Sequence, residues 1–213
     1  MVPTHPSAAV FDRWSATYDR PGLQLFTYRP IHDAVLARID GLEPSMVVDL
    51  GCGTGQLTQR LIRGFPDANI VGVDLSDGML TEAAVRLRQD GGDDQPLVRA
   101  DALQLPFAPS SIDLVVCTES FHWYPDQTAA LAELARVLNP GGRLLIASIA
   151  TVTGAGDRLL RGATSAGGRT IRALPPHRMR KLLDRSGFEV ISQHRVPRLG
   201  LIAWPVLTDA RLP

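Results

Sequence analysis

An acidic residue followed by alternating glycines is the group whose residue types and spacing most clearly indicate chemistry in this chain. In the stretch MVVDLGCGTG, Asp49 is followed by Gly51, Gly53 and Gly55. Glycine has no Cβ atom, so a glycine loop lets backbone N–H groups approach a ligand closely. An ordinary turn between a strand and a helix needs only one glycine. Three glycines after an acid therefore favour a ligand-binding loop at the end of a strand.

Two more aspartates, Asp74 and Asp101, also end short apolar runs. The carboxyl ends of parallel strands in an open sheet lie along one edge, where ligands bind. Each acid alone could be a helix cap or a turn residue, but beside the glycine loop they indicate one site. Asp74 follows Gly51 by 23 residues, a spacing at which an acid can accept hydrogen bonds from a ribose. The expected ligand therefore contains a ribose and a base.

The order of the glycines distinguishes two kinds of nucleotide ligand. A dinucleotide site has the pattern G-x-G-x-x-G, so that the pyrophosphate meets the N-terminus of a helix. Here Gln56 stands where that pattern has its last glycine. The carboxylate of Asp49 would repel a pyrophosphate but would attract an ammonium group. The sequence therefore favours a nucleoside with an amino-acid tail.

The elements that must position these residues alternate between short apolar runs and amphipathic helical patterns. This alternation predicts right-handed βαβ units and a mostly parallel sheet. Strands are expected at residues 46–48, 70–74, 97–101, 112–117 and 143–149. Helices are expected after the glycine loop, after Asp74, and from Asp126 to the helix-breaking sequence that starts at Asn139. A further helix around residues 179–183 precedes two strands, at 188–196 and 199–204, expected as an antiparallel pair at the sheet edge.

Two segments outside this alternation are candidates for covering the ligand loop. Helices are expected from Ser7 to Tyr18 and from Pro30 to Gly41, before the first strand. They could cover the loop or simply pack against the sheet, and the sequence leaves both alternatives open. Residues 150–174, with their glycines and scattered arginines, could form a mobile lid.

The composition is that expected of one globular cytoplasmic domain. A chain of 213 residues, 45% of them hydrophobic, can bury a sizeable core. Its 22 basic residues balance 22 acidic ones, which argues against steering to nucleic acid or to a membrane surface. Cys52 and Cys117 lie in or beside expected strands, so we expect reduced core cysteines. The sequence shows no secretory signal, membrane span or metal-ligand cluster.

Several motifs, in order, resemble those of the class I S-adenosylmethionine-dependent methyltransferases, most strongly the branch that includes the ubiquinone/menaquinone C-methyltransferases. VVDLGCGTG is similar to the first motif of this family and IVGVDLSDGML to the second. RADALQLPFAPSSIDLVVC matches the stretch that frames the adenine, and LARVLNPGGRLLI the helix, turn and strand that follow. The N-terminal FDRWSATYD also resembles the opening segment of this branch.

The resemblance implies an α/β, doubly wound, Rossmann-like fold with a mostly parallel seven-stranded sheet whose last strand is antiparallel. Residues 1–213 are expected to form a single domain. Residues 1–42 would be an N-terminal helical cover and 43–149 the cofactor-binding core. Residues 150–213 would be a short lid segment followed by a helix and an antiparallel strand pair.

The resemblance also implies a site for S-adenosyl-L-methionine. Gly51, Gly53 and Gly55 would lie against the methionine part of this cofactor, with Asp49 near its ammonium group. Asp74 would hold the ribose hydroxyls.

Further residues would contact the base and the sulfonium end. Leu75 and Met79 would pack on the adenine, and Asp101 would accept a hydrogen bond from its amino group. Thr118 and Glu119 would lie by the sulfonium. The remaining expected cofactor contacts are Tyr18, Cys52, Gln56, Ala102 and Leu103.

The expected function is in-line methyl transfer to a small-molecule acceptor, driven mainly by proximity and orientation. A non-catalytic cofactor-binding subunit or sensor, and a methyltransferase acting on a macromolecule, are the alternatives. A nucleic-acid methyltransferase is disfavoured because TESFHW, from Thr118 to Trp123, stands where such enzymes have Asn-Pro-Pro-Tyr. His122 is a candidate general base, since histidine titrates in the right range, but it could instead orient the substrate. The short segment 150–174 leaves room for a homodimer to complete the pocket.

Overall fold

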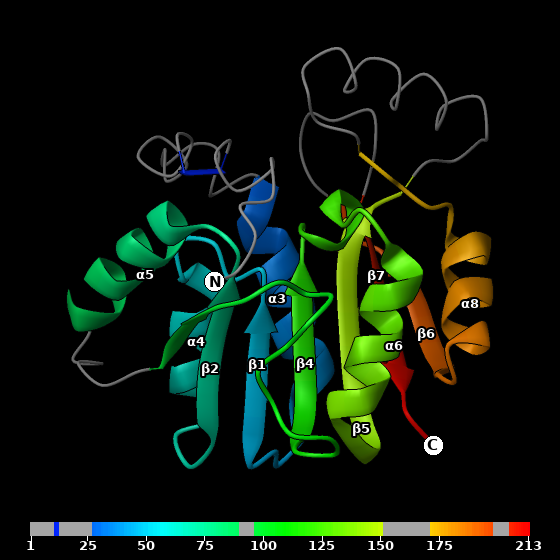
Figure 1. Ribbon diagram of the computed structural model, residues 1–213, viewed down its shortest axis with the longest axis horizontal. Helices are drawn as coiled ribbons and strands as arrows, with labels where there is room; N and C mark the ends of the chain where they lie inside the picture. The colour runs from blue at the N-terminus through cyan, green and yellow to red at the C-terminus, as the bar shows by residue number, and fades with distance from the viewer. Residues whose placement is uncertain (1–10, 13–26, 90–95, 151–170, 198–204) are drawn as a thin grey trace.

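The computed structural model describes residues 11–12, 27–89, 96–150, 171–197 and 205–213, which form a central sheet with helices on both faces (Figure 1). The strands are β1 (Met46–Leu50), β2 (Asn69–Asp74), β3 (Leu97–Arg99), β4 (Ile112–Thr118), β5 (Leu138–Ile149), β6 (Glu189–Arg195) and β7 (Pro205–Arg211). The helices are α3 (Arg29–Ile39), α4 (Gln56–Gly64), α5 (Asp77–Gln89), η2 (Phe121–Trp123), α6 (Gln127–Val137) and α8 (Pro176–Arg185). None of the described helices is long and apolar enough to cross a bilayer.

The strand order in the sheet is β3-β2-β1-β4-β5-β7-β6. The strands β1 to β5 pair in parallel, whereas β7 runs antiparallel to both β5 and β6. This topology confirms the predicted α/β fold with a mostly parallel seven-stranded sheet and an antiparallel last strand. The strand order reverses between β1 and β4, which is where ligands bind in open parallel sheets.

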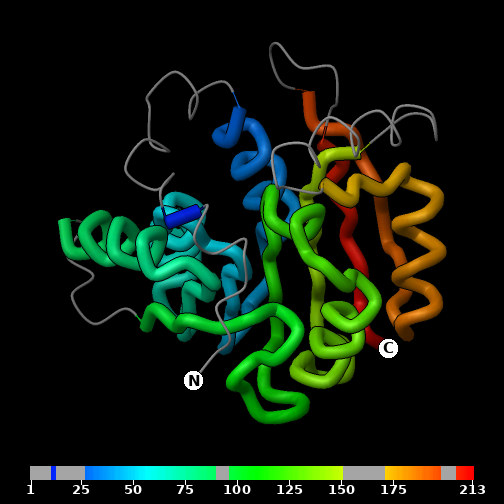
Figure 2. Tube along the Cα trace, turned by 45° about the horizontal axis from the view of Figure 1, so that its top comes forward, coloured from blue at the N-terminus to red at the C-terminus, as the bar shows by residue number. Residues whose placement is uncertain are grey.

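The sheet separates two hydrophobic clusters. Helices α6 and α8 lie in front of it in Figure 1 and bury Leu131, Leu134 and Leu183. Helix α3 lies behind it and, together with α4, buries Val35 and Leu61 on the opposite face. Coverage of both faces explains why the parallel strands are continuous apolar runs. The carboxyl ends of β1, β2 and β4 are left at one edge, between α5 and α6 (Figure 2).

Helix α3 forms where the sequence predicts a helix. It carries Pro30 in its first turn and ends at Ile39, and its apolar residues Ile31, Val35 and Ile39 are buried. The other predicted N-terminal helix, residues 7–18, lies outside the described residues except for Phe11 and Asp12.

Strand β5 is longer than predicted, since it begins at Leu138 rather than at Arg143. The turn sequence that starts at Asn139 ends helix α6, as predicted, but it also joins the sheet. The N–H of Gly141 donates to the carbonyl of Leu212 at 2.7 Å, so the far end of the chain holds this turn in place.

The last strand is not where the sequence analysis placed it. The predicted range 199–204 lies outside the described residues, and β7 occupies Pro205–Arg211. Strand β7 contains the buried residue Asp209. Its carboxylate pairs with Arg38 at 2.5 Å and with Arg143 at 2.6 Å, so the charge is compensated inside the fold. Proline is compatible with a strand at its first residue.

Candidate active site

The three glycines after β1 differ in what their missing side chains allow. All have positive φ angles, 73° at Gly51, 54° at Gly53 and 77° at Gly55, which L side chains rarely adopt. A Cβ atom on Gly51 would lie 2.3 Å from Oγ of Ser120, and one on Gly55 would lie 3.0 Å from Cβ of Ala83. A Cβ atom on Gly53 would meet no atom of the described residues within 4 Å. Packing therefore requires glycine at two of the positions, while the third faces open space.

Asp74 ties the glycine loop to the end of β2. Its two carboxylate oxygens accept backbone hydrogen bonds from Gly53 and Ser76, each at 2.9 Å. Burial raises the pKa of Asp74. Each oxygen has two lone pairs, so the carboxylate keeps acceptor capacity for a ligand.

Asp49 lies inside the protein, directly before the loop. Its side chain is fully buried and accepts a hydrogen bond from Oγ1 of Thr58 at 2.6 Å. The second oxygen, Oδ1, has no hydrogen-bond partner among the described residues. Burial raises the pKa of Asp49 to about 7, the Thr58 hydrogen bond opposes this rise, and the nearby Asp74 adds to it.

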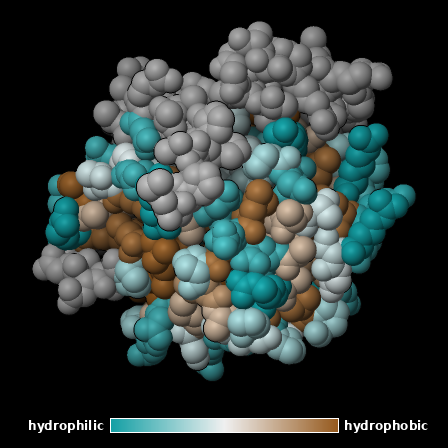
Figure 3. Space-filling view, in the orientation of Figure 1, coloured by the Kyte–Doolittle hydropathy of each residue, from teal (hydrophilic) through white to brown (hydrophobic). Residues whose placement is uncertain are grey.

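A cleft opens at the carboxyl ends of the strands. Hydrophobic side chains gather beside helix α5 on this side of the molecule (Figure 3). Nine of the residues expected at the cofactor line the cleft: Gly51, Gly53, Asp74, Leu75, Met79, Asp101, Ala102, Thr118 and Glu119. Glu119 has a φ of 53° although it is not glycine. Strained backbone of this kind clusters at functional sites.

A smaller cavity adjoins the cleft and shares Gly51, Gly53 and Thr118 with it. Cys52 and Gln56, both expected at the cofactor, line this cavity. An elongated ligand could therefore occupy both spaces by crossing the glycine loop.

These walls fit a nucleoside with an amino-acid tail. Leu75, Met79 and other apolar residues offer a surface for a base, and Asp74 and Asp101 offer acceptors for hydroxyl and amino groups. A tail that crosses the loop meets Gly53, where a side chain would occupy the open space.

Comparisons with known proteins show which family this chain is related to. Residues 48–146 match the family described as Methyltransferase domain. The chain is 34% identical over 204 residues to malonyl-[acyl-carrier protein] O-methyltransferase of Geobacter sulfurreducens, which covers 90% of this chain and 73% of that protein. The chain belongs to the class I S-adenosylmethionine-dependent methyltransferases.

The chain has further relatives. It is 34% identical over 139 residues to trans-aconitate 2-methyltransferase of Acidovorax sp., covering 65% of this chain and 47% of that protein. The solved S-adenosylmethionine-dependent methyltransferase of Aquifex aeolicus has the same fold, with a TM-score of 0.73 at 18% identity over 95% of this chain and 98% of that one. The chain spans about half the length of the first curated relatives that it matches. The family confirms the expected fold class and S-adenosylmethionine as the cofactor.

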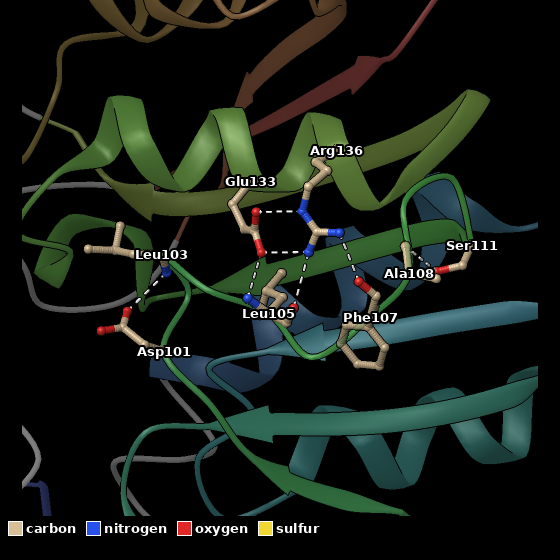
Figure 4. Close-up of polar contacts among 8 residues, drawn as sticks. All are labelled: Asp101, Leu103, Leu105, Phe107, Ala108, Ser111, Glu133 and Arg136. Atoms are coloured by element: carbon tan, nitrogen blue, oxygen red, sulfur yellow. Dashed lines mark hydrogen bonds and ion pairs between the residues drawn. The ribbon is translucent and has the colours of Figure 1, made fainter. Parts of the chain in front are cut away.

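Helix α6 holds the loop between β3 and β4 through an ion pair (Figure 4). Glu133 accepts the N–H of Leu105 at 2.7 Å and pairs with Arg136 at 2.7 Å. Arg136 donates to the carbonyls of Leu105 and Phe107 at 3.1 and 2.9 Å, and its hydrogen bonds hold the pKa of Glu133 below the usual value. Asp101 lies at the start of the same loop, so α6 positions one wall of the cleft.

Four predicted site residues line neither cavity or cannot be placed. Asp49 and Leu103 are absent from both walls, and Gly55 packs against α5. Tyr18 lies outside the described residues. Roles for these residues at the cofactor stay predictions.

The candidate base His122 also lines neither cavity. Its side chain is only 1% exposed, its Nδ1 lies 3.2 Å from Oγ of Ser148, and its ring stacks beside Trp123 with 5.1 Å between centroids. General-base catalysis by His122 stays a prediction. The imidazole is not part of the cleft wall that the described residues form.

Ser120, which the sequence analysis did not select, joins the glycine loop to the end of β4. Its Oγ donates to the carbonyl of Leu50 at 3.2 Å and lies 3.1 Å from Oη of Tyr124 and 3.0 Å from Sγ of Cys117. Burial raises the pKa of Cys117 to about 11, so this thiol stays protonated and is not a nucleophile. The stretch SFHWY after strand β4 was the available signal for Ser120 and Tyr124.

The described N-terminal residues lie partly at the two cavities and partly against the sheet. Phe11 lines the cleft and packs edge-on against Trp123, with ring centroids 5.6 Å apart. Helix α3 packs on the sheet, but Tyr28, directly before the helix, and His32, in its first turn, line the smaller cavity. No local signal in the sequence distinguishes His32 from an ordinary residue of an amphipathic helix.

Proposed function

We propose that this protein transfers the methyl group of S-adenosylmethionine to a small-molecule acceptor. The observation that carries the proposal is the cleft at the carboxyl ends of β1, β2 and β4, whose walls contain nine of the residues that the family resemblance implies at the cofactor. Family membership supports the same chemistry.

The described residues have complementary roles in this proposal. Asp74 accepts hydrogen bonds from the ribose hydroxyls, and Asp101 accepts one from the adenine amino group. Leu75 and Met79 pack against the adenine, while the N–H groups of the glycine loop face the amino-acid tail. Thr118 and Glu119, at the end of β4, lie at the side from which an acceptor would approach.

The contribution of the protein is to position the reactants and exclude water. When bound, S-adenosylmethionine supplies an activated methyl group. Orientation of the acceptor in line with that group can be worth about 7–11 kcal/mol of the barrier. Trp123 and Phe11 present aromatic surface at the cleft, which can stabilise a cation by about 0.5–2 kcal/mol.

A carboxylic acid is the acceptor class that we propose to test first. The names of the relatives specify malonyl-[acyl-carrier protein] and trans-aconitate as acceptors, and both molecules carry carboxylates. A carboxyl group with a pKa near 4 is already ionised at neutral pH, so its oxygen needs no general base. The described walls of the cleft contain no histidine, which agrees with such an acceptor.

The proposal is tested first by calorimetry with S-adenosylhomocysteine, with NAD as the control, and then by methyl transfer. The transfer assay uses labelled S-adenosylmethionine with small carboxylic acids, malonyl thioesters, phenols and amines. Binding of S-adenosylhomocysteine with transfer to one of these classes supports the proposal. Failure to bind it would overturn the cofactor assignment. Binding without transfer to any class would favour a cofactor-binding subunit or sensor.

Three finer points belong to the same proposal. We propose that the acceptor is not a nucleic acid, because the basic and acidic residues of the chain balance. We also propose a cytoplasmic location and a homodimer. Light scattering in solution decides the oligomeric state.

A further inference from the structure

A histidine of helix α3 forms part of the wall of the smaller cavity without using its ring nitrogens inside the protein. His32 is 7% exposed and lies in that wall with Gly51, Gly53 and Gln56. Its imidazole makes no hydrogen bond to any of the described residues. The ring nitrogens keep solvent-accessible area, and the side chain that carries them lines the smaller cavity.

The surroundings keep this imidazole neutral. Burial lowers the pKa of His32 to about 4, the guanidinium of Arg60 adds to the lowering, and Asp33 opposes it. Arg60 itself is paired with Asp33 at 2.5 Å. A neutral imidazole has one N–H donor and one acceptor nitrogen. A ligand group that accepts a hydrogen bond from this N–H takes the place of water in the cavity.

The position of the smaller cavity determines which part of the cofactor His32 can reach. The nucleoside-binding acids Asp74 and Asp101 line the larger cleft only, while Gly51 and Gly53 line both spaces. A nucleoside seated in the cleft therefore directs its tail across the glycine loop and into the smaller cavity. An amino-acid tail ends in an ammonium and a carboxylate, and of these only the carboxylate accepts a hydrogen bond.

We propose that the ring N–H of His32 binds the carboxylate of the cofactor's amino-acid tail. Helix α3 is then a cofactor-binding element as well as a cover for the sheet. Tyr28, at the start of this helix, lines the same cavity. This inference rests on the proposed function, because it assigns one end of the S-adenosylmethionine site.

The test compares two ligands that differ only in the tail. S-adenosylhomocysteine has the amino-acid tail, whereas methylthioadenosine has the same nucleoside and thioether without it. His32→Leu keeps apolar bulk on α3 but removes the donor. We expect it to raise the Kd of S-adenosylhomocysteine about 10- to 100-fold and to change the Kd of methylthioadenosine less than about twofold. His32→Gln, which retains an N–H donor, should recover part of the lost affinity.

The control variant is His177→Ala, at an exposed histidine of α8, which should bind both ligands like the wild type. Equal weakening of both ligands by His32→Leu would show that the residue acts through packing of α3, and unchanged affinity for both would exclude a contact. Either result overturns the inference. If His32→Leu does not fold, His32→Ala replaces it with the same expected results. Failure of the wild-type protein to bind either ligand would overturn the proposed function instead.

Discussion

Asp74 supports the glycine loop and faces the cleft with the same carboxylate. Asp74→Ala removes the acceptor that we propose for the ribose and also frees the N–H of Gly53. We expect a loss of S-adenosylhomocysteine affinity on the order of 1–3 kcal/mol, measured by calorimetry. Asp67→Ala, at an exposed aspartate before β2, is the control and should bind normally. Wild-type affinity in Asp74→Ala would show that this carboxylate is not at the ribose.

Asp49 makes the stability of the ligand-free protein depend on pH. Burial raises its pKa in the folded state from 3.8 to about 7, so folding favours the protonated form. The stabilisation is complete below about pH 4 and is lost as the pH rises through about 7. The free energy of unfolding of the wild type should therefore fall between pH 5 and pH 8 relative to that of Asp49→Asn. Urea denaturation at both pH values measures this difference, and parallel pH profiles would contradict it.

His122 can be tested for a structural role against a catalytic one. Because its imidazole is buried beside Ser148, His122→Ala should lower the free energy of unfolding by about 1–3 kcal/mol. At a temperature where the variant stays folded, methyl transfer should keep the pH profile of the wild type. Loss of the acidic limb of that profile in His122→Ala would instead establish the general base that the sequence predicts.

At the scale of elements, helix α6 and the loop after β3 form a unit that positions Asp101. Glu133→Ala removes the acceptor for the N–H of Leu105 and releases Arg136 from its ion pair. The loosened loop should raise the KM for S-adenosylmethionine about three- to tenfold, with kcat changed less than about twofold, since a ground-state contact is lost. Asp184→Ala, at an exposed acid of α8, should leave KM unchanged.

A second variant, Glu133→Gln, tests whether the ion pair acts on cofactor binding or on the chemical step. Glu133→Gln keeps an acceptor for Leu105, so its KM should lie between those of the wild type and Glu133→Ala. A fall in kcat with unchanged KM would show that the loop acts on the chemical step rather than on cofactor binding.

At the scale of the whole molecule, Asp209 joins segments from both ends of the chain. It is fully buried in β7 and pairs with Arg38 of α3 and Arg143 of β5. Asp209→Ala leaves two guanidinium groups without their partner, although both reach solvent. The free energy of unfolding should fall by about 2–4 kcal/mol, measured by urea denaturation. Glu189→Ala, which breaks an exposed pair with Arg211, should cost about 1 kcal/mol at most. Equal losses of unfolding free energy in the two variants would mean that the buried ion pairs of Asp209 stabilise the fold no more than an exposed pair does.

The sequence by itself determined the features that depend on neighbouring residues. The short apolar strand, the glycines with positive φ and the helix that follows could be predicted because turn chemistry and hydrophobic periodicity are local. The same holds for α6, where the side chain of Asp126 accepts from the N–H groups of Thr128 and Ala129 as the predicted cap. Alternation of such units was enough to predict a parallel sheet and a site at its carboxyl edge.

Only the tertiary structure decided the features that depend on distant partners. A strand containing Asp209 is stable because Arg38 and Arg143 come from other elements to compensate the charge. His122 follows strand β4, as predicted, yet its imidazole is buried beside Ser148 and lines neither cavity. His32 lies in the wall of the smaller cavity because α3 crosses the sheet beside the glycine loop. Burial and charge pairing arise when the chain folds, so the order of residues alone does not show which polar groups face a ligand.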